Sequence, residues 1–204
     1  MSNQNFILIL SGVIGILSGL AAVILKKAVH FIQVFLTEDF YVEYANFLYI
    51  LYPIIGISAA YVLSKYIFKD FGGHGIPDVL FTISKKQSLI PRIKTYSRVI
   101  TSALTVGFGG SVGLEAPMLV TGSAIGSNIG VSMHLNAKKR TLLIGCGAAG
   151  AISAIFGAPI GAVIFAIEVI LMEISTASFI PLLIASVMGS LTSMVLIGRD
   201  QLFK

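Results

Sequence analysis

Charged residues are scarce in this sequence of 204 residues: Asp, Glu, Lys and Arg together make up 11% of it, and hydrophobic residues 56%. A soluble domain carries roughly 25% charge. The composition therefore excludes an ordinary soluble domain and predicts a membrane protein. The net charge of +5 does not indicate a nucleic-acid partner, because the basic residues lie between apolar runs, where they orient membrane helices.

Cysteine is nearly absent as well, since Cys146 is the single one. An intrachain disulfide is therefore excluded, and we expect Cys146 to pack as a small hydrophobic residue. The first apolar run lacks a basic leader and an Ala-x-Ala cleavage site, so we interpret it as a helix and not as a removed signal. No His, Cys, Asp or Glu cluster has metal-ligand spacing, so we expect no metal and no cofactor.

Long apolar runs are present, and they predict an all-α, polytopic membrane protein. Full spans are expected at Phe6–Leu25, continuing past Lys26 and Lys27 towards Phe35, at Phe47–Phe68 and at Phe179–Ile197. Shorter apolar segments are expected near Pro77–Ser84, Tyr96–Val106, Met118–Ile129, Thr141–Ala154 and Ile160–Met172. The last two flank a Gly/Pro break and resemble a re-entrant pair. Small residues four apart, Gly15 with Gly19 and Gly122 with Gly126, predict close helix packing.

The sign of the charge differs between the connecting loops. The loop after the first span is acidic, and the loops after the second span and before Thr141 are basic. By the positive-inside tendency, the N-terminus is expected in the cytoplasm, and we expect a multi-pass protein of a bacterial plasma membrane. Lys26 and Lys27 interrupt the first apolar run. They either extend along the helix towards the interface or line a wet surface.

The sequence GFGGSVGLEAP, Gly107–Pro117, lies at the centre of the chain. Glycines precede Pro117, and proline suits the first turn of a helix. We therefore predict a broken backbone that ends in a helix N-terminus near Ala116. The first N–H groups of a helix lack internal partners and carry the positive end of the dipole, so they favour an anion. Glu115 would put a carboxylate where such an anion binds, either as a gate or as a static cap.

A second break of the same kind is Gly72–Pro77, GGHGIP, which is followed by Asp78 in the first helical turn. Asp78 is interpreted as stabilising the helix dipole. Broken helices that direct their N-termini inward mark substrate sites in transporters. An enzyme is not expected, because a nucleotide-binding reading of the glycines needs a soluble βαβ unit and no Ser/His/Asp set is present.

These motifs resemble those of the CLC chloride channels and chloride/proton exchangers. GGHGIP is similar to their GSGIP motif, Gly110–Pro117 to their G(K/R)EGP motif, and Gly147–Glu168 to the helix, break and helix that follow. The resemblance implies the first of the two inverted halves of a CLC subunit, an anion (chloride) channel or transporter with voltage gating or proton antiport among its activities.

The resemblance also implies roles for individual residues. Glu115 would be the gating glutamate. The anion-binding set would be His74, Gly75, Ile76, Pro77, Gly113, Leu114, Glu115, Ala116 and Pro117. Glu168 would be an internal proton or polar site, or else a hydrogen-bond or ion-pair partner within the bundle.

Several residues depart from the family pattern. His74 replaces a serine; it either supplies an N–H donor or is a polar residue at a surface turn. Leu114 replaces a basic residue and Ala116 a glycine. Val169 stands where the exchangers carry a second glutamate, which favours a channel or a weakly coupled transporter.

The family's second half carries a GxFxP motif, and these 204 residues contain neither that motif nor a cytoplasmic nucleotide-binding module. We treat the chain as a single domain over residues 1–204. The resemblance leaves two alternatives, a conducting half-size relative or a non-conducting fragment or assembly partner. It implies pairing as a homodimer or with a second half, through the Ile160–Met172 and Phe179–Ile197 helices.

Overall fold

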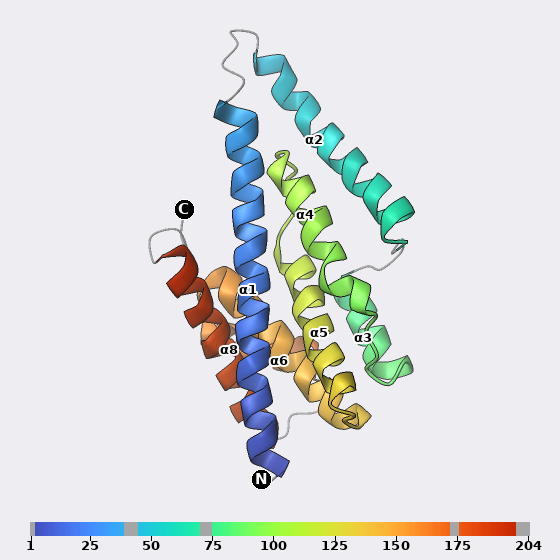
Figure 1. Ribbon diagram of the computed structural model, residues 1–204, viewed down its shortest axis with the longest axis vertical. Helices are drawn as coiled ribbons and strands as arrows, with labels where there is room; N and C mark the ends of the chain where they lie inside the picture. The colour runs from blue at the N-terminus through green and yellow to red at the C-terminus, as the bar shows by residue number, and fades with distance from the viewer. Residues whose placement is uncertain (1–2, 39–44, 70–74, 172–175, 199–204) are drawn as a thin grey trace.

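The protein is described here by a computed structural model, which places residues 3–38, 45–69, 75–171 and 176–198 (Figure 1). These residues are α-helical apart from short turns and contain no strand, as the composition predicts. The α-helices are α1 (Asn3–Glu38), α2 (Ala45–Val62), α3 (Ile76–Lys85), α4 (Ser97–Gly107), α5 (Glu115–Ser132), α6 (Ala137–Phe156), α7 (Pro159–Val169) and α8 (Thr176–Ile197). A π-helical turn, η1 (Leu63–Ile67), extends α2, and a 3-10 turn, η2 (Arg92–Thr95), precedes α4.

Three helices, α1, α6 and α8, are long and apolar enough to cross a membrane. At 36 residues, α1 is about 54 Å long against a hydrocarbon core of roughly 30 Å. The prediction that the first helix continues past Lys26 and Lys27 is confirmed, and the extra length requires tilt or extension beyond the bilayer.

Three other helices are too short to cross a membrane alone. α3 has 10 residues, and α4 and α7 have 11 each, so the longest reaches only about 16 Å. The helix, break and helix predicted around Gly157 are present, but α6 has 20 residues and is itself long enough to cross. Within this pair only α7 is short.

Helix α6 occupies the middle of the molecule, with α5 on one side and α1 and α8 on the other (Figure 1). A methyl group on Gly122 of α5 would collide with the carbonyl oxygen of Gly147 of α6, and one on Gly15 of α1 would collide with the backbone of Ala185 of α8. Lipid tails are as apolar as leucine, so helices in a membrane associate through this kind of close packing. The predicted small-residue faces are therefore the contact surfaces, and Cys146 is fully buried among them.

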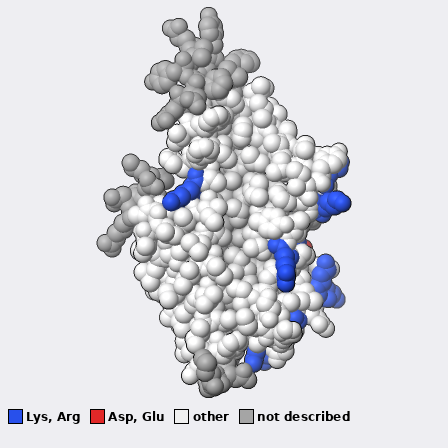
Figure 2. All heavy atoms as spheres, viewed as in Figure 1, with Lys and Arg blue, Asp and Glu red and all other residues white. Residues whose placement is uncertain are grey.

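Basic residues gather at one end of the helix bundle. The turn after α3 is held to α5 and α6, because Ser127 Oγ donates to Ser88 O at 2.7 Å and Arg140 Nη2 donates to Gln87 O at 2.9 Å. This turn joins the basic ends of α3, η2 and α6. Figure 2 shows most of the Lys and Arg side chains of this face along its right side, from mid-height down to the end where α1 starts in Figure 1, and one at the upper left.

We predict that Gly122→Ala destabilises the protein by about 1–3 kcal/mol, because the new methyl group meets the α6 backbone, which cannot move away cheaply. Gly161→Ala is the matched control, since the nearest atom to a methyl group there is 3.8 Å away and alanine favours a helix. Thermal unfolding in detergent measures both variants. Equal melting temperatures for the two would contradict the packing of α5 on α6.

Candidate anion site

The starts of α3 and α5 meet at one place, although 39 positions separate Ile76 from Glu115 in the sequence. Gly75 precedes α3 with φ of 64°, a left-handed conformation that glycine adopts without strain. A methyl group on Gly75 would lie 3.4 Å from the Cβ of Ala116, in the first turn of α5. Gly75 and the first turn of α5 therefore lie side by side, and the positive ends of α3 and α5 are close together.

Neither start is capped by a side chain, since Gly75 and Leu114 make no side-chain hydrogen bond to the turns that follow them. Helix α6 differs, because Asn136 Oδ1 accepts from the N–H of Lys139 at 3.0 Å. An uncapped helix start presents N–H groups to whatever occupies the space before it. Pro77 and Pro117 have no N–H and serve only to fix the backbone.

Glu115 is the first residue of α5 and is exposed. Its carboxylate folds back over the loop, because a methyl group built on Gly113 would overlap Glu115 Oε2. Gly113 thus leaves the space that the carboxylate fills. The carboxylate lies at the N-terminal end of its own helix, where an anion would compete with it for the dipole and the N–H groups.

Asp78 of α3 forms an ion pair with Lys94 of η2. The Lys94 side chain is 10% exposed and that of Asp78 24%. The expected dipole role of Asp78 is therefore accompanied by a partly buried ion pair that ties α3 to η2. Sequence reasoning missed this pair because the two residues belong to different elements.

Glu168 lies in the last turn of α7 and is exposed. The next residue, Val169, is partly buried and packs with Ile76 against the core formed by α5 and α6. No described contact joins Glu168 to the two helix starts. His74, the residue expected at the centre of the first motif, lies outside the described residues.

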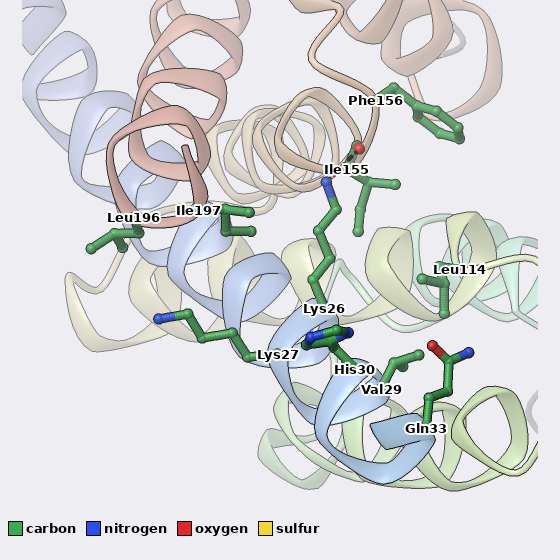
Figure 3. A pocket seen from close by; sticks show the side chains of 10 residues that line it. All are labelled: Lys26, Lys27, Val29, His30, Gln33, Leu114, Ile155, Phe156, Leu196 and Ile197. Carbon is green, nitrogen blue, oxygen red and sulfur yellow. Dashed lines mark hydrogen bonds between the residues drawn. The ribbon is translucent and has the colours of Figure 1, made fainter. Parts of the chain in front are cut away.

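A pocket of about 660 Å³ opens beside the start of α5 (Figure 3). It is lined by Lys26, Lys27, Val29, His30, Gln33, Leu114, Ile155, Phe156, Leu196 and Ile197. Lys26 Nζ donates to Ile155 O at 2.8 Å and to Ala154 O at 3.3 Å, which are carbonyls at the end of α6. Lys26 thus lines a pocket and bonds to another helix.

Sequence reasoning did not assign a site to Lys26, but a signal was present. Lys26, His30 and Gln33 follow one another at i, i+4 and i+7, which places them on one face of an otherwise apolar helix. Polar spacing of this kind within a span indicates a surface turned away from lipid.

These features define a polytopic membrane protein with broken helices whose N-termini meet, an architecture suited to binding anions. The profile of the family described as voltage gated chloride channel matches residues 55–204. The chain belongs to this family.

Relatives and solved structures agree with that assignment. The chain is 30% identical over 195 residues to an uncharacterised protein of Methanocaldococcus jannaschii, covering 95% of this chain and 45% of that protein. It is 29% identical over 169 residues to the H(+)/Cl(-) exchange transporter ClcA of Salmonella arizonae, covering 79% of this chain and 36% of the transporter. The chain therefore spans less than half the length of these relatives.

The crystal structure of a CLC-type fluoride/proton antiporter superposes with a TM-score of 0.78 at 30% identity, over 96% of this chain and 48% of that one. A slow cyanobacterial Cl-/H+ antiporter superposes with a TM-score of 0.83 at 21% identity, over 98% of this chain and 48% of that one, and supports the fold alone.

We predict that Asp78→Asn destabilises the protein by about 1–3 kcal/mol, because it leaves the charge of the nearly buried Lys94 without its carboxylate. The double variant Asp78→Leu/Lys94→Met removes both charges and should recover most of the loss. Thermal unfolding of the single and double variants measures the coupling. A double variant less stable than Asp78→Asn would contradict this account of the pair.

Proposed function

We propose that the chain is a subunit of an anion channel or transporter, in which a small anion such as chloride binds at the joined starts of α3 and α5. The observation that carries the proposal is the contact between Gly75 and Ala116, which brings two uncapped helix N-termini to one point. Backbone N–H groups from Gly75–Ile76 and Gly113–Ala116 would hold the anion, and the sequence offers His74 as a further candidate.

In this proposal Glu115 is the gate. Its carboxylate already lies before the first turn of α5, over Gly113. When ionised it competes with the anion for the same N–H groups, and when protonated it loses that attraction and leaves the site. The alternative, a static cap, requires the carboxylate to stay in place whatever the pH.

Orientation and assembly belong to the same proposal. The basic end of the molecule would face the cytoplasm together with the N-terminus. Exposed apolar side chains on α7 and α8 would face lipid or a partner subunit, and they include Ile160, Ile164, Phe179, Ile180, Leu191 and Val195. The Glu168 carboxylate on α7 would be a polar or proton-accepting group reached from the cytoplasm.

A second candidate is a half-length chain that conducts only together with a complementary half. The observation that favours it is the length of the relatives, since the matched proteins and structures are about twice as long as this chain or longer. Reconstitution separates the two candidates. Anion flux from the chain alone supports a homodimer of halves, and flux only after a second half is added supports the other candidate.

We expect chloride efflux from liposomes containing the protein to rise roughly threefold or more between pH 7.5 and pH 4.5, because protons remove the charge of Glu115. Glu115→Gln should conduct at both pH values as the unsubstituted protein does at low pH. A chloride electrode measures the efflux. Flux that still follows pH in Glu115→Gln would refute the gate.

Glu168→Gln makes the same chemical change at the exposed carboxylate of α7. We expect it to keep the pH-dependent chloride efflux and to reduce any accompanying proton movement, which a pH-sensitive dye reports. A pH-independent efflux in Glu168→Gln would mean that Glu168, and not Glu115, is the gate.

We further predict that Gly113→Ala opens the site without unfolding the protein. The new methyl group displaces the flexible Glu115 carboxylate from the space it fills, so stability should change by no more than about 1 kcal/mol. Efflux at pH 7.5 should rise towards that of Glu115→Gln. An unchanged efflux with an unchanged melting temperature would contradict the position of the carboxylate.

A further inference from the structure

One face of α1 is polar in the middle of an apolar helix. Lys26, His30 and Gln33 line the pocket beside α5, and Figure 3 shows their side chains directed from α1 towards the same open space. Gln33 also lines a second pocket of about 310 Å³, bounded by α2 and by the Gly107–Gly109 loop. The two pockets therefore share Gln33 as a lining residue, and between them they border α1 from Lys26 to Leu36.

Lys26 provides the charge at the inner end of this polar face. An ammonium group has three N–H donors, and two of them engage the carbonyl groups of Ala154 and Ile155 at the end of α6. The third can reach a ligand in the pocket. The two carbonyls fix the ammonium at the end of α6, in the pocket that Leu114 also lines.

Helix α5 has no cation of its own near the candidate site, since the sequence from Gly107 to Met133 contains neither lysine nor arginine. Leu114, which precedes Glu115, lines the same pocket as Lys26. Leu114 also packs against the cluster that contains Leu25, Val29 and Ile155. Two lysines of α1, Lys26 and Lys27, line this pocket. Of the two, Lys26 is the one whose ammonium group is held at the end of α6 by hydrogen bonds.

We propose that the pocket lined by Lys26, His30, Gln33 and Leu114 is an access site for small inorganic anions, from which they reach the start of α5. Lys26 supplies the attraction, and the polar face of α1 replaces part of the anion's hydration shell. The identity of the ligand rests on the proposed anion function. A charge within a membrane helix is costly unless it faces water or a partner, which fits this role.

A purely structural role is the competing interpretation. Helix C-termini leave carbonyls without partners, and lysine near such an end satisfies them. That role needs a hydrogen-bond donor but does not need a charge. The two interpretations therefore differ in what Lys26→Gln does, because glutamine keeps the donor and loses the charge.

The test measures the accessibility and the potential of the pocket without measuring flux. His30 is exposed and one helical turn from Lys26, whereas the natural Cys146 is fully buried. His30→Cys in reconstituted protein is labelled with an anionic and with a cationic methanethiosulfonate of similar size. We expect labelling by both reagents, with the anionic one faster by roughly fivefold relative to a free thiol.

Adding Lys26→Gln to His30→Cys should bring the ratio of the two rates close to that of the free thiol, and Lys26→Arg should preserve it. Lys26→Gln with Leu114→Lys should restore part of the ratio, because the second substitution returns a cation to the same pocket. Lys138→Gln is the matched control, since it removes an exposed lysine at the opposite end of α6. It should leave the ratio unchanged.

Ile24→Cys gives the background for a lipid-facing position, because Ile24 is 59% exposed and lies two residues from Lys26, on the other side of α1. Labelling of His30→Cys no faster than of Ile24→Cys would overturn the access site. A ratio that Lys26→Gln leaves unchanged would overturn the role of its charge. Neither result bears on Glu115, so failure here is distinct from failure of the gate.

Discussion

Close backbone contact at α6 is the constraint on which the rest of the structure depends. Gly147 meets Gly122 of α5, and Gly150 meets Gly189 of α8. No larger residue fits at these crossings, which hold α5 and α8 against α6, and Gly150 also lies against Gly15 of α1. The start of α5 and the polar face of α1 converge because both helices pack on α6.

The helix ends of this structure differ in how their backbone groups find hydrogen-bond partners. The start of α6 is capped by Asn136, and its end is satisfied by Gly157 and Lys26. Buried or lipid-facing backbone groups that lack a partner are costly, so such caps are expected in a membrane protein. The starts of α3 and α5 have no side-chain cap and lie together. The starts of α4 and α7 lack a side-chain cap as well. What distinguishes α3 and α5 is therefore that their uncapped starts lie together.

Much of the fold follows from local sequence. Pro77 and Pro117 each lie within the first turn of a helix, as predicted, because proline fixes its own backbone and cannot continue a helix from the preceding turn. Pro159 was expected in the break before a helix and is instead the first residue of α7. The small-residue faces of α1 and α5 were also recognised, since their spacing is that of a helix. The turns η1 and η2 were not predicted, because short π and 3-10 turns depend on how neighbouring helices end.

Contacts between distant parts of the chain could not be read from the sequence. Lys26 lies 129 residues from Ile155, and Asp78 meets Lys94 across a turn. Nothing in the local pattern of either pair selects its partner. Composition and Gly/Pro placement by themselves determined a membrane protein of broken helices with anion-favouring starts. Only the tertiary structure decided that two of those starts lie together and that a lysine of α1 lines the pocket beside the start of α5, because packing on α6 sets which ends meet.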